Sequence, residues 1–189
     1  MSVSLKQIYI PAWIIVILCV FNPQQVFSQQ NNLDRIALRW DSFRKVPNSK
    51  RPFIAYTAHK TMHKYRATQR GNQLSLKFEV GVTLDTQQSF LDPNKLKTLD
   101  APGKKALLNH EQGHSDLAII YGRVLYSRLS KGEYSIAGYK KEVKSIYDSV
   151  MKELARLNIK YDMETEHGQY EEEQQKWDLY FKKGLEGKS

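Results

Sequence analysis

The sequence predicts an α+β protein in which an N-terminal antiparallel β-sheet is followed by three helices. Between residues 74 and 84, apolar side chains alternate with mostly polar ones, which is typical of a strand with one buried face. After residue 100, apolar residues recur three and four positions apart through three successive segments, which is typical of amphipathic helices. A chain of 189 residues is long enough for one domain with its own core.

The first segment has the pattern of an export signal. Lys6 precedes an apolar run over residues 8–21, and Ser28 offers a small residue for cleavage. The run is shorter than the about 20 residues of a membrane-spanning helix, so we expect no stable membrane insertion after signal cleavage. An uncleaved N-terminal anchor is the alternative. We therefore expect a signal peptide at 1–28, a single domain at 29–189, and an exported protein that is periplasmic or secreted.

Cysteine usage and charge narrow the function classes. The only cysteine, Cys19, lies in the expected signal peptide, so the mature chain has no disulfide, thiol nucleophile or cysteine-based zinc site. An exported chain without cysteine fits a bacterial envelope. The net charge is +9, but Lys and Arg are scattered among acidic residues, which predicts no nucleic-acid binding. A basic surface protein for anionic polymers stays open as an alternative.

The N-terminal half contains the expected sheet. Aromatic and β-branched residues indicate its strands, and Gly, Pro and Asn mark the connections. The expected elements are, in order, a strand at 36–40 with Trp40 and Phe43 buried at its end, a loop at 45–52, a strand at 53–67, a turn at Arg70-Gly71-Asn72 and a strand at 74–84.

The C-terminal half contains the expected helices. A connector at 85–102 ends with Asp100, which is placed to cap the first of them. The expected helices run over 103–129, 135–157 and 169–183, with a break at 161–168 and with Tyr170, Trp177 and Phe181 buried by the last helix.

The motif His110-Glu111-Gln112-Gly113-His114 lies within the first helix. Residues four apart share one face of a helix, so both imidazoles can bind one metal ion. Zn²⁺ suits neutral imidazole nitrogens, and Glu111 is placed to act as a general base on a zinc-activated water. The alternative is a solvated helix face with two ordinary histidines.

The third ligand is less defined by the pattern. Catalytic zinc usually has three protein ligands, and position 120, where one extended motif places a third His, is Ile120. His167 is a candidate because it lies just before Gly168 at the break between helices. His59 and His63 are expected to be exposed or hydrogen-bonded rather than to form a second metal site. The competing carboxylates are Glu142, Glu153, Glu164 and Glu166.

Several blocks resemble a bacterial family, the domain of unknown function 922, whose members are described as secreted zinc-dependent proteases. The resemblance implies a compact zincin-like fold in which His110, His114 and Glu111 keep these roles, and it favours His167 as third ligand. Ser115 departs from similar sequences, which often have an aromatic residue there. The matching blocks are Leu38 to Phe43, Ala55 to Thr57, Phe78 to Val80 with Ser89-Phe90, Leu107 to His114, and Tyr161 to Gly168 with Gln174 and Trp177.

The functional expectation is an exported zinc peptidase. Glu111 accepts a proton from the zinc-bound water, which attacks a peptide carbonyl. Tyr161 is a candidate hydrogen-bond donor to the developing oxyanion, with a buried structural tyrosine as the alternative. The expected partner is a peptide or protein substrate, and no residue pattern indicates a cleavage specificity or an oligomeric state. The alternative function is an inactive zincin-fold scaffold or binding module in the cell envelope.

Overall fold

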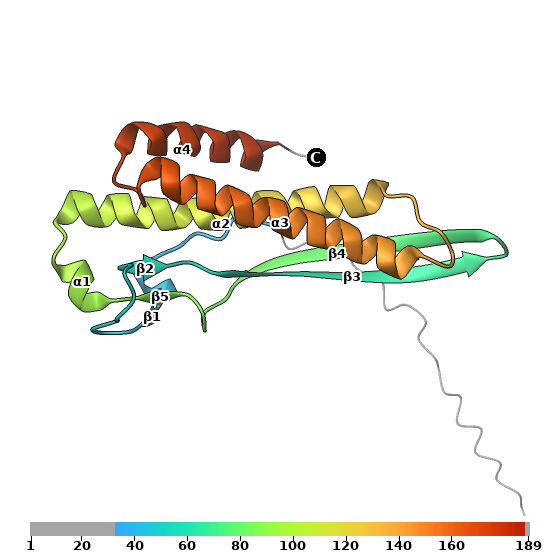
Figure 1. Cartoon of the computed structure of the whole chain (residues 1–189), viewed down its shortest axis with the longest axis horizontal. Helices are drawn as coiled ribbons and strands as arrows, with labels where there is room; N and C mark the ends of the chain where they lie inside the picture. Colours follow the sequence, from blue (N-terminus) through green and yellow to red (C-terminus); the bar gives the residue numbers. More distant parts are fainter. Residues whose placement is uncertain (1–32, 188–189) are drawn as a thin grey trace, which may run out of the picture.

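The two longest strands form a twisted hairpin that extends beyond the helices (Figure 1). In this computed structural model, which describes residues 33–187, β3 (His59–Arg70) pairs antiparallel with β4 (Gln73–Leu84). Gly71, with a φ of 57°, and Asn72 form the two-residue turn that the sequence predicted. The predicted alternation of β4 is confirmed, because Phe78, Val80 and Val82 are buried. The expected signal peptide at 1–28 lies outside the described residues.

A second, smaller sheet adjoins the hairpin. It has the order β1 (Arg44–Lys45), β5 (Phe90–Leu91), β2 (Ala55–Tyr56), with β1 parallel and β2 antiparallel to β5. The β3–β4 hairpin confirms the expected antiparallel pairing, but the parallel pair β1–β5 was not predicted. The expected continuous strand at 53–67 is wrong, because it is divided into β2 and β3. The chain leaves β2 at Thr57 because the Ala58 N–H donates to Ser89 Oγ at 3.0 Å, while the Ala58 carbonyl accepts from Asp85 N at 2.8 Å.

The expected strand at 36–40 is also wrong. These residues lie against a helix, and their backbone groups are bonded to its side chains instead of to a neighbouring strand. Gln112 donates to the Ile36 carbonyl at 2.9 Å and accepts from the Leu38 N–H at 2.8 Å. Trp40–Ser42 forms a short 3₁₀ helix, and Phe43 is buried as expected, whereas Trp40 is half-buried.

The long helix α2 (Ala101–Lys131) confirms the helix predicted at 103–129. Asp100 caps it as expected, since its Oδ1 accepts from Gly103 N at 2.8 Å. The connector before it is more ordered than predicted. It contains β5 and the short helix α1 (Pro93–Lys97), which begins at Asp92, whose buried carboxylate accepts from the N–H groups of Asn94 and Lys95.

Helix α3 (Tyr139–Thr165) begins and ends later than predicted, and α4 (Glu171–Glu186) follows it. The predicted break at Tyr161 is wrong, because α3 continues to Thr165 before the chain turns. Trp177 and Phe181 are buried as expected, whereas Tyr170 is exposed.

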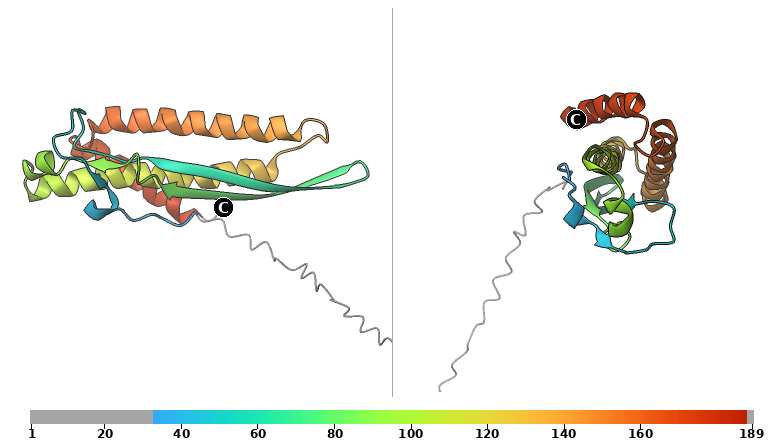
Figure 2. Two further views of the ribbon diagram at one scale, coloured as in Figure 1. Left: turned by 90° about the horizontal axis from the view of Figure 1, so that it is seen from below. Right: turned by 90° about the vertical axis from the view of Figure 1, so that its left-hand side faces the viewer.

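Helix α2 lies at the centre of the fold, between the β3–β4 hairpin and α4, with α3 along its side (Figures 1 and 2). Two clusters of buried side chains hold these layers together. One cluster joins α2 to β4 and α3 through Ile119, Leu125, Leu129, Phe78, Val80, Val82, Val143 and Val150. The other joins α2 to the ends of α3 and α4 through Leu117, Ile120, Tyr161, Trp177 and Phe181.

No helix among the described residues is both long and apolar enough to cross a membrane.

Candidate metal centre

The two motif histidines lie one turn apart in the interior of α2, as predicted. The ring centroids of His110 and His114 are 4.8 Å apart, and the rings meet edge to face. His110 is buried, and His114 is half-buried. Because α2 continues well beyond both residues in each direction, its backbone hydrogen bonds fix their relative position.

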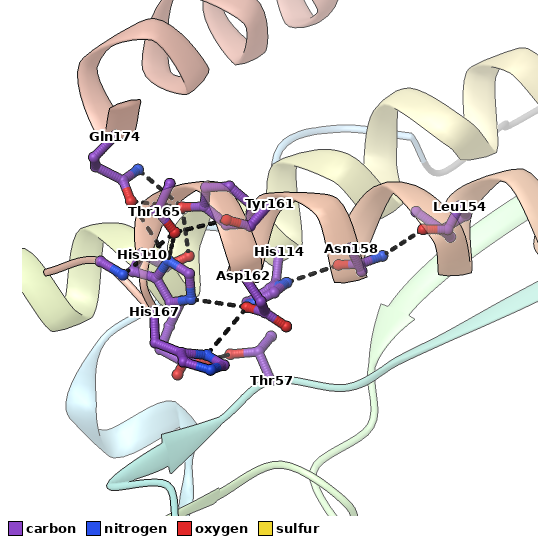
Figure 3. A network of polar contacts seen from close by, with 12 residues as sticks. Thr57, His110, His114, Leu154, Asn158, Tyr161, Asp162, Thr165, His167 and Gln174 are labelled. Atoms are coloured by element: carbon purple, nitrogen blue, oxygen red, sulfur yellow. Dashed lines mark hydrogen bonds and ion pairs between the residues drawn. The ribbon is translucent and has the colours of Figure 1, made fainter. Parts of the chain in front are cut away.

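Asp162 of α3 supplies a third group that sequence reasoning missed. Its Oδ1 lies 3.1 Å from His110 Nε2 and 3.0 Å from His114 Nε2 (Figure 3). One potential ligand atom from each of these three residues lies within 4.8 Å of the other two. In a tetrahedral zinc site with bonds of 2.0–2.1 Å, neighbouring ligand atoms are about 3.3–3.4 Å apart. The two distances to Asp162 Oδ1 are close to this value, so the three side chains are candidate ligands for one zinc ion.

His167 lies next to this triad, but on its solvent side. Its Nδ1 is 3.5 Å from Asp162 Oδ1, and its side chain is 52% exposed. The turn after α3 places it there through three consecutive positive φ angles, at Glu166, His167 and Gly168. Gly168 has to be glycine, since a Cβ would lie 2.7 Å from the Cβ of His110. His167 is thus beside the expected site, whereas the more buried third donor is Asp162.

The four competing glutamates are directed elsewhere. The carboxylate of Glu142 accepts from Ser135, that of Glu153 pairs with Arg128, and that of Glu164 accepts from Trp177 Nε1. Glu166 is exposed in the left-handed turn at the end of α3. None of them is a suitable third ligand in this arrangement.

Hydrogen bonds fix the ring of His114. Its Nδ1–H donates to Asn158 Oδ1 at 2.7 Å, while Asn158 Nδ2 donates to the Leu154 carbonyl at 2.9 Å and so orients the amide (Figure 3). With Nδ1–H retained, Nε2 is the nitrogen that faces Asp162 Oδ1, and loss of its proton would leave its lone pair free for a metal ion. Such partners behind a metal-binding imidazole are usual in zinc sites.

The ring of His110 is held from behind by α3 and α4. Thr165 Oγ1 donates to the Tyr161 carbonyl at 2.7 Å and lies 3.3 Å from His110 Nδ1, so it can accept from that nitrogen. Tyr161 stacks on the imidazole with centroids 4.5 Å apart and donates from its hydroxyl to the His110 carbonyl at 3.0 Å. Gln174 Nε2 donates to the Tyr161 hydroxyl at 2.8 Å.

These contacts correct the role expected of Tyr161. Its side chain is fully buried, and its hydroxyl lies on the side of His110 away from the cleft, bonded to protein groups. Burial raises the pKa of this phenol well above its usual range, so it stays protonated. Tyr161 is a positioning residue for His110, and its geometry offers no contact with an oxyanion.

Glu111 is buried beside the triad and has a defined partner. Thr57, in the short break between β2 and β3, donates from Oγ1 to Glu111 Oε2 at 2.5 Å. Both residues line the same cleft as His110 and His114. Thr57 is a second residue that the sequence did not reveal, because its position depends on the interruption of the strand that we expected to be continuous.

The charges of the site favour an ionised Asp162. Burial alone would raise its pKa, but hydrogen bonds from His110 and His114 lower it far below the usual range. Burial opposes the charge on His114, yet the hydrogen bond to Asp162 and the charge of Glu111 raise the pKa of that imidazole. A compact group of one carboxylate and two imidazoles is a candidate site for a divalent cation.

The other two histidines have partners, as we expected. His59 Nε2 lies 3.1 Å from Ser115 Oγ, and His63 packs on Tyr147 with centroids 4.9 Å apart. Burial, and then the charge of His114, lower the pKa of His59 to about 4, so this imidazole is neutral at physiological pH. Among the described residues, the structure brings only one group of three potential ligands together, at Asp162.

Other residues in and next to the motif hold α2 in place. Gln112 and Asp116 face away from the triad and bind the N-terminal segment, in which Arg35 forms a two-pronged ion pair with Asp116 at 2.8 Å. Gly113 faces α3 and α4, where a Cβ would lie 2.7 Å from Phe181 Cε2. The helix therefore presents the candidate metal ligands on one side and packing contacts on its other sides.

The triad lies in a cleft of about 1310 Å³. One wall is the chain from Pro52 to Met62, the opposite wall is α3, and α2 forms the floor. The α3 wall is largely apolar, with Met151, Leu154 and Ala155 facing the cleft. The space is large enough for a segment of polypeptide next to Glu111.

Comparison with known proteins gives one match. The sequence model of a family described as a bacterial protein of unknown function (DUF922) matches residues 31–168, which include the α2 motif, Asp162 and His167. No curated protein and no solved structure matches the chain.

Proposed function

This chain belongs to the bacterial DUF922 family, and from the geometry of its site we propose that it is an exported, zinc-dependent peptidase. The observation that supports this most directly is the convergence of two imidazole nitrogens and one carboxylate oxygen beside a buried glutamate. His110, His114 and Asp162 would hold Zn²⁺, and three protein ligands leave one position for water or substrate. Export rests on the N-terminal sequence pattern.

The protein groups have separate tasks in the proposed reaction. When bound, zinc supplies Lewis-acid activation of water and of the substrate carbonyl. Glu111 accepts the proton of the attacking water and then delivers it to the leaving amine. Thr57 holds one carboxylate oxygen of Glu111, which leaves the other oxygen for the proton. Tyr161 and Asn158 orient the two imidazoles from behind.

The cleft supports a peptide substrate over a small molecule. It extends from the triad between one strand and one helix, and its walls combine backbone groups of β3 with the apolar side chains of α3. An extended peptide presents complementary groups, because it has unpaired amides and side chains on alternate sides. The alternative is a scaffold protein that binds metal at the same site but does not hydrolyse peptides. The following experiment separates the peptidase from the scaffold.

The test uses the mature chain, residues 29–189, with Glu111→Gln and the exposed Glu133→Gln as a matched control. We expect about one zinc per chain in all three proteins by elemental analysis. Hydrolysis of a mixed peptide pool should fall by about 10²–10⁴-fold in Glu111→Gln only. Zinc well below one per chain in the unmodified protein would refute the metal site, and equal hydrolysis by Glu111→Gln would refute the proposed catalysis.

The third ligand is tested separately. Asp162→Ala should abolish stoichiometric zinc binding, because it removes the carboxylate that contacts both imidazoles. His167→Ala should have the smaller effect, since its exposed ring lies at the edge of the triad. The reverse order of zinc affinities would assign the third position to His167.

A further inference from the structure

The edge of β3 that borders the cleft has backbone groups that do not pair with β4. Ala58 pairs with Asp85 through a backbone hydrogen bond of 2.8 Å, and the register continues without interruption to the turn. In an antiparallel ladder, alternate residues direct their N–H and C=O groups outwards. By this alternation, His59, Thr61 and His63 direct theirs away from β4, towards α3.

One of these outward groups is already bonded to α3. The Tyr147 hydroxyl donates to the Thr61 carbonyl at 3.2 Å, which confirms the direction of that carbonyl independently. The Tyr147 ring also packs on His63 at 4.9 Å, and one step further Tyr65 meets Tyr139 at 6.0 Å. From Thr61 outwards, side chains therefore join β3 to α3.

This junction limits the cleft on one side of the triad. Glu111 contacts Thr57, and the junction begins at Thr61, which is four residue steps or about 13 Å further along the chain. On the opposite wall, the span from Asn158 to Tyr147 along α3 is about 16 Å. Both walls give room for about four residues of an extended peptide.

We propose that Tyr147, supported by His63, closes one end of the substrate cleft, so that a bound peptide extends no more than about four residues past the metal centre on that side. The substrate class is then a peptide cut within about four residues of one terminus. Between the triad and Tyr147, the peptide pairs with the outward backbone groups of His59 and packs on Met151, Leu154 and Ala155. This inference rests on the proposed peptidase function and assigns Tyr147 a specificity role within it.

The first experiment measures where peptides are cut. The zinc-loaded mature protein is incubated with a digest of an unfolded protein, in peptides of about 8 to 20 residues, and the products are identified by mass spectrometry. We expect every cut to lie within about four residues of the same terminus. Tyr147→Ala should produce cuts further from that terminus at least tenfold more often, whereas Tyr147→Phe, which keeps the ring, should retain the limit.

The second experiment measures binding without turnover. In zinc-loaded Glu111→Gln, the peptide pool should slow hydrogen exchange of the His59 backbone amide. The exchange rate of the His63 backbone amide should stay the same. Adding Tyr147→Ala should extend the protection to Thr61 and His63. If Tyr147→Ala fails to fold, Tyr147→Leu keeps apolar volume and serves in its place.

The outcomes separate the two proposals. Frequent cuts by the unmodified protein more than about five residues from both termini would overturn the closed end and leave the peptidase function standing. An unchanged cleavage pattern in folded Tyr147→Ala would also overturn it. Absence of both cleavage and peptide binding would overturn the proposed function, and this inference with it.

Discussion

Replacing Asn158 by alanine tests whether the proposed zinc site depends on residues that are not themselves candidate ligands. In the folded protein, Asn158 Oδ1 accepts from His114 Nδ1–H at 2.7 Å, and the Leu154 carbonyl locks its amide. Without this acceptor, the imidazole gains a second tautomer and rotational freedom. Its Nε2 lone pair is then directed at the metal for only part of the time.

The size of the effect follows from these contacts. The lost hydrogen bond contributes about 0.5–1.5 kcal/mol, which is up to about tenfold in affinity. The additional freedom of the ring raises the total to the 10–100-fold loss typical of such supporting groups, or about 1.4–2.8 kcal/mol. We therefore expect Asn158→Ala to bind zinc about 10–100-fold more weakly than the unmodified protein.

The assay is competition for zinc against a chromophoric chelator, with two control variants. Asn158→Asp keeps an acceptor and should preserve the affinity. Asn109→Ala, on the exposed side of α2, removes a comparable amide that only contacts Asp178, and it should leave zinc binding within twofold. An Asn158→Ala affinity indistinguishable from that of Asn109→Ala would refute the reasoning.

Three further predictions concern the helix interface, pH and the partner of the general base. Gly113→Ala should destabilise the protein by about 1–3 kcal/mol in chemical denaturation, because its Cβ would clash with Tyr161 and Phe181, whereas Gly81→Ala, with open space around it, should not. Between pH 6.5 and about 4, the unfolded chain protonates His59 while the folded chain does not, so metal-free stability should fall as pH falls through this window, by up to about 3 kcal/mol. His59→Asn should flatten that dependence, and an unchanged slope would contradict it. Thr57→Val should lower kcat at constant zinc content, and Thr57→Ser should restore it.

The sequence was most informative where function depends on local spacing. The separation of His110 and His114 and the alternation of β4 follow from one helical and one strand repeat, and both are present in the structure. Family membership was also recognisable from blocks of sequence, and the match over residues 31–168 confirms it.

Long-range contacts explain what the sequence did not predict. Asp162 became a candidate only once α3 was seen to continue to Thr165, which places Asn158 and Asp162 one turn apart on the same side of the helix. The helical pattern is hard to recognise there, because Tyr161 and Thr165 contact a polar network around His110 in addition to the apolar cluster. Residues 36–40 resemble a strand, but their backbone partners are the side chains of α2.

The part of the chain that supports the site extends beyond the family match, because it includes helix α4. The match ends at residue 168, whereas Gln174, Trp177 and Phe181 of α4 are buried against Tyr161, which supports His110 from behind. A chain shortened to the matched segment would keep every proposed zinc ligand and Glu111, yet it would open the back of His110 to water. The segment by which this protein is recognised is therefore shorter than the segment that surrounds the proposed metal site on all sides.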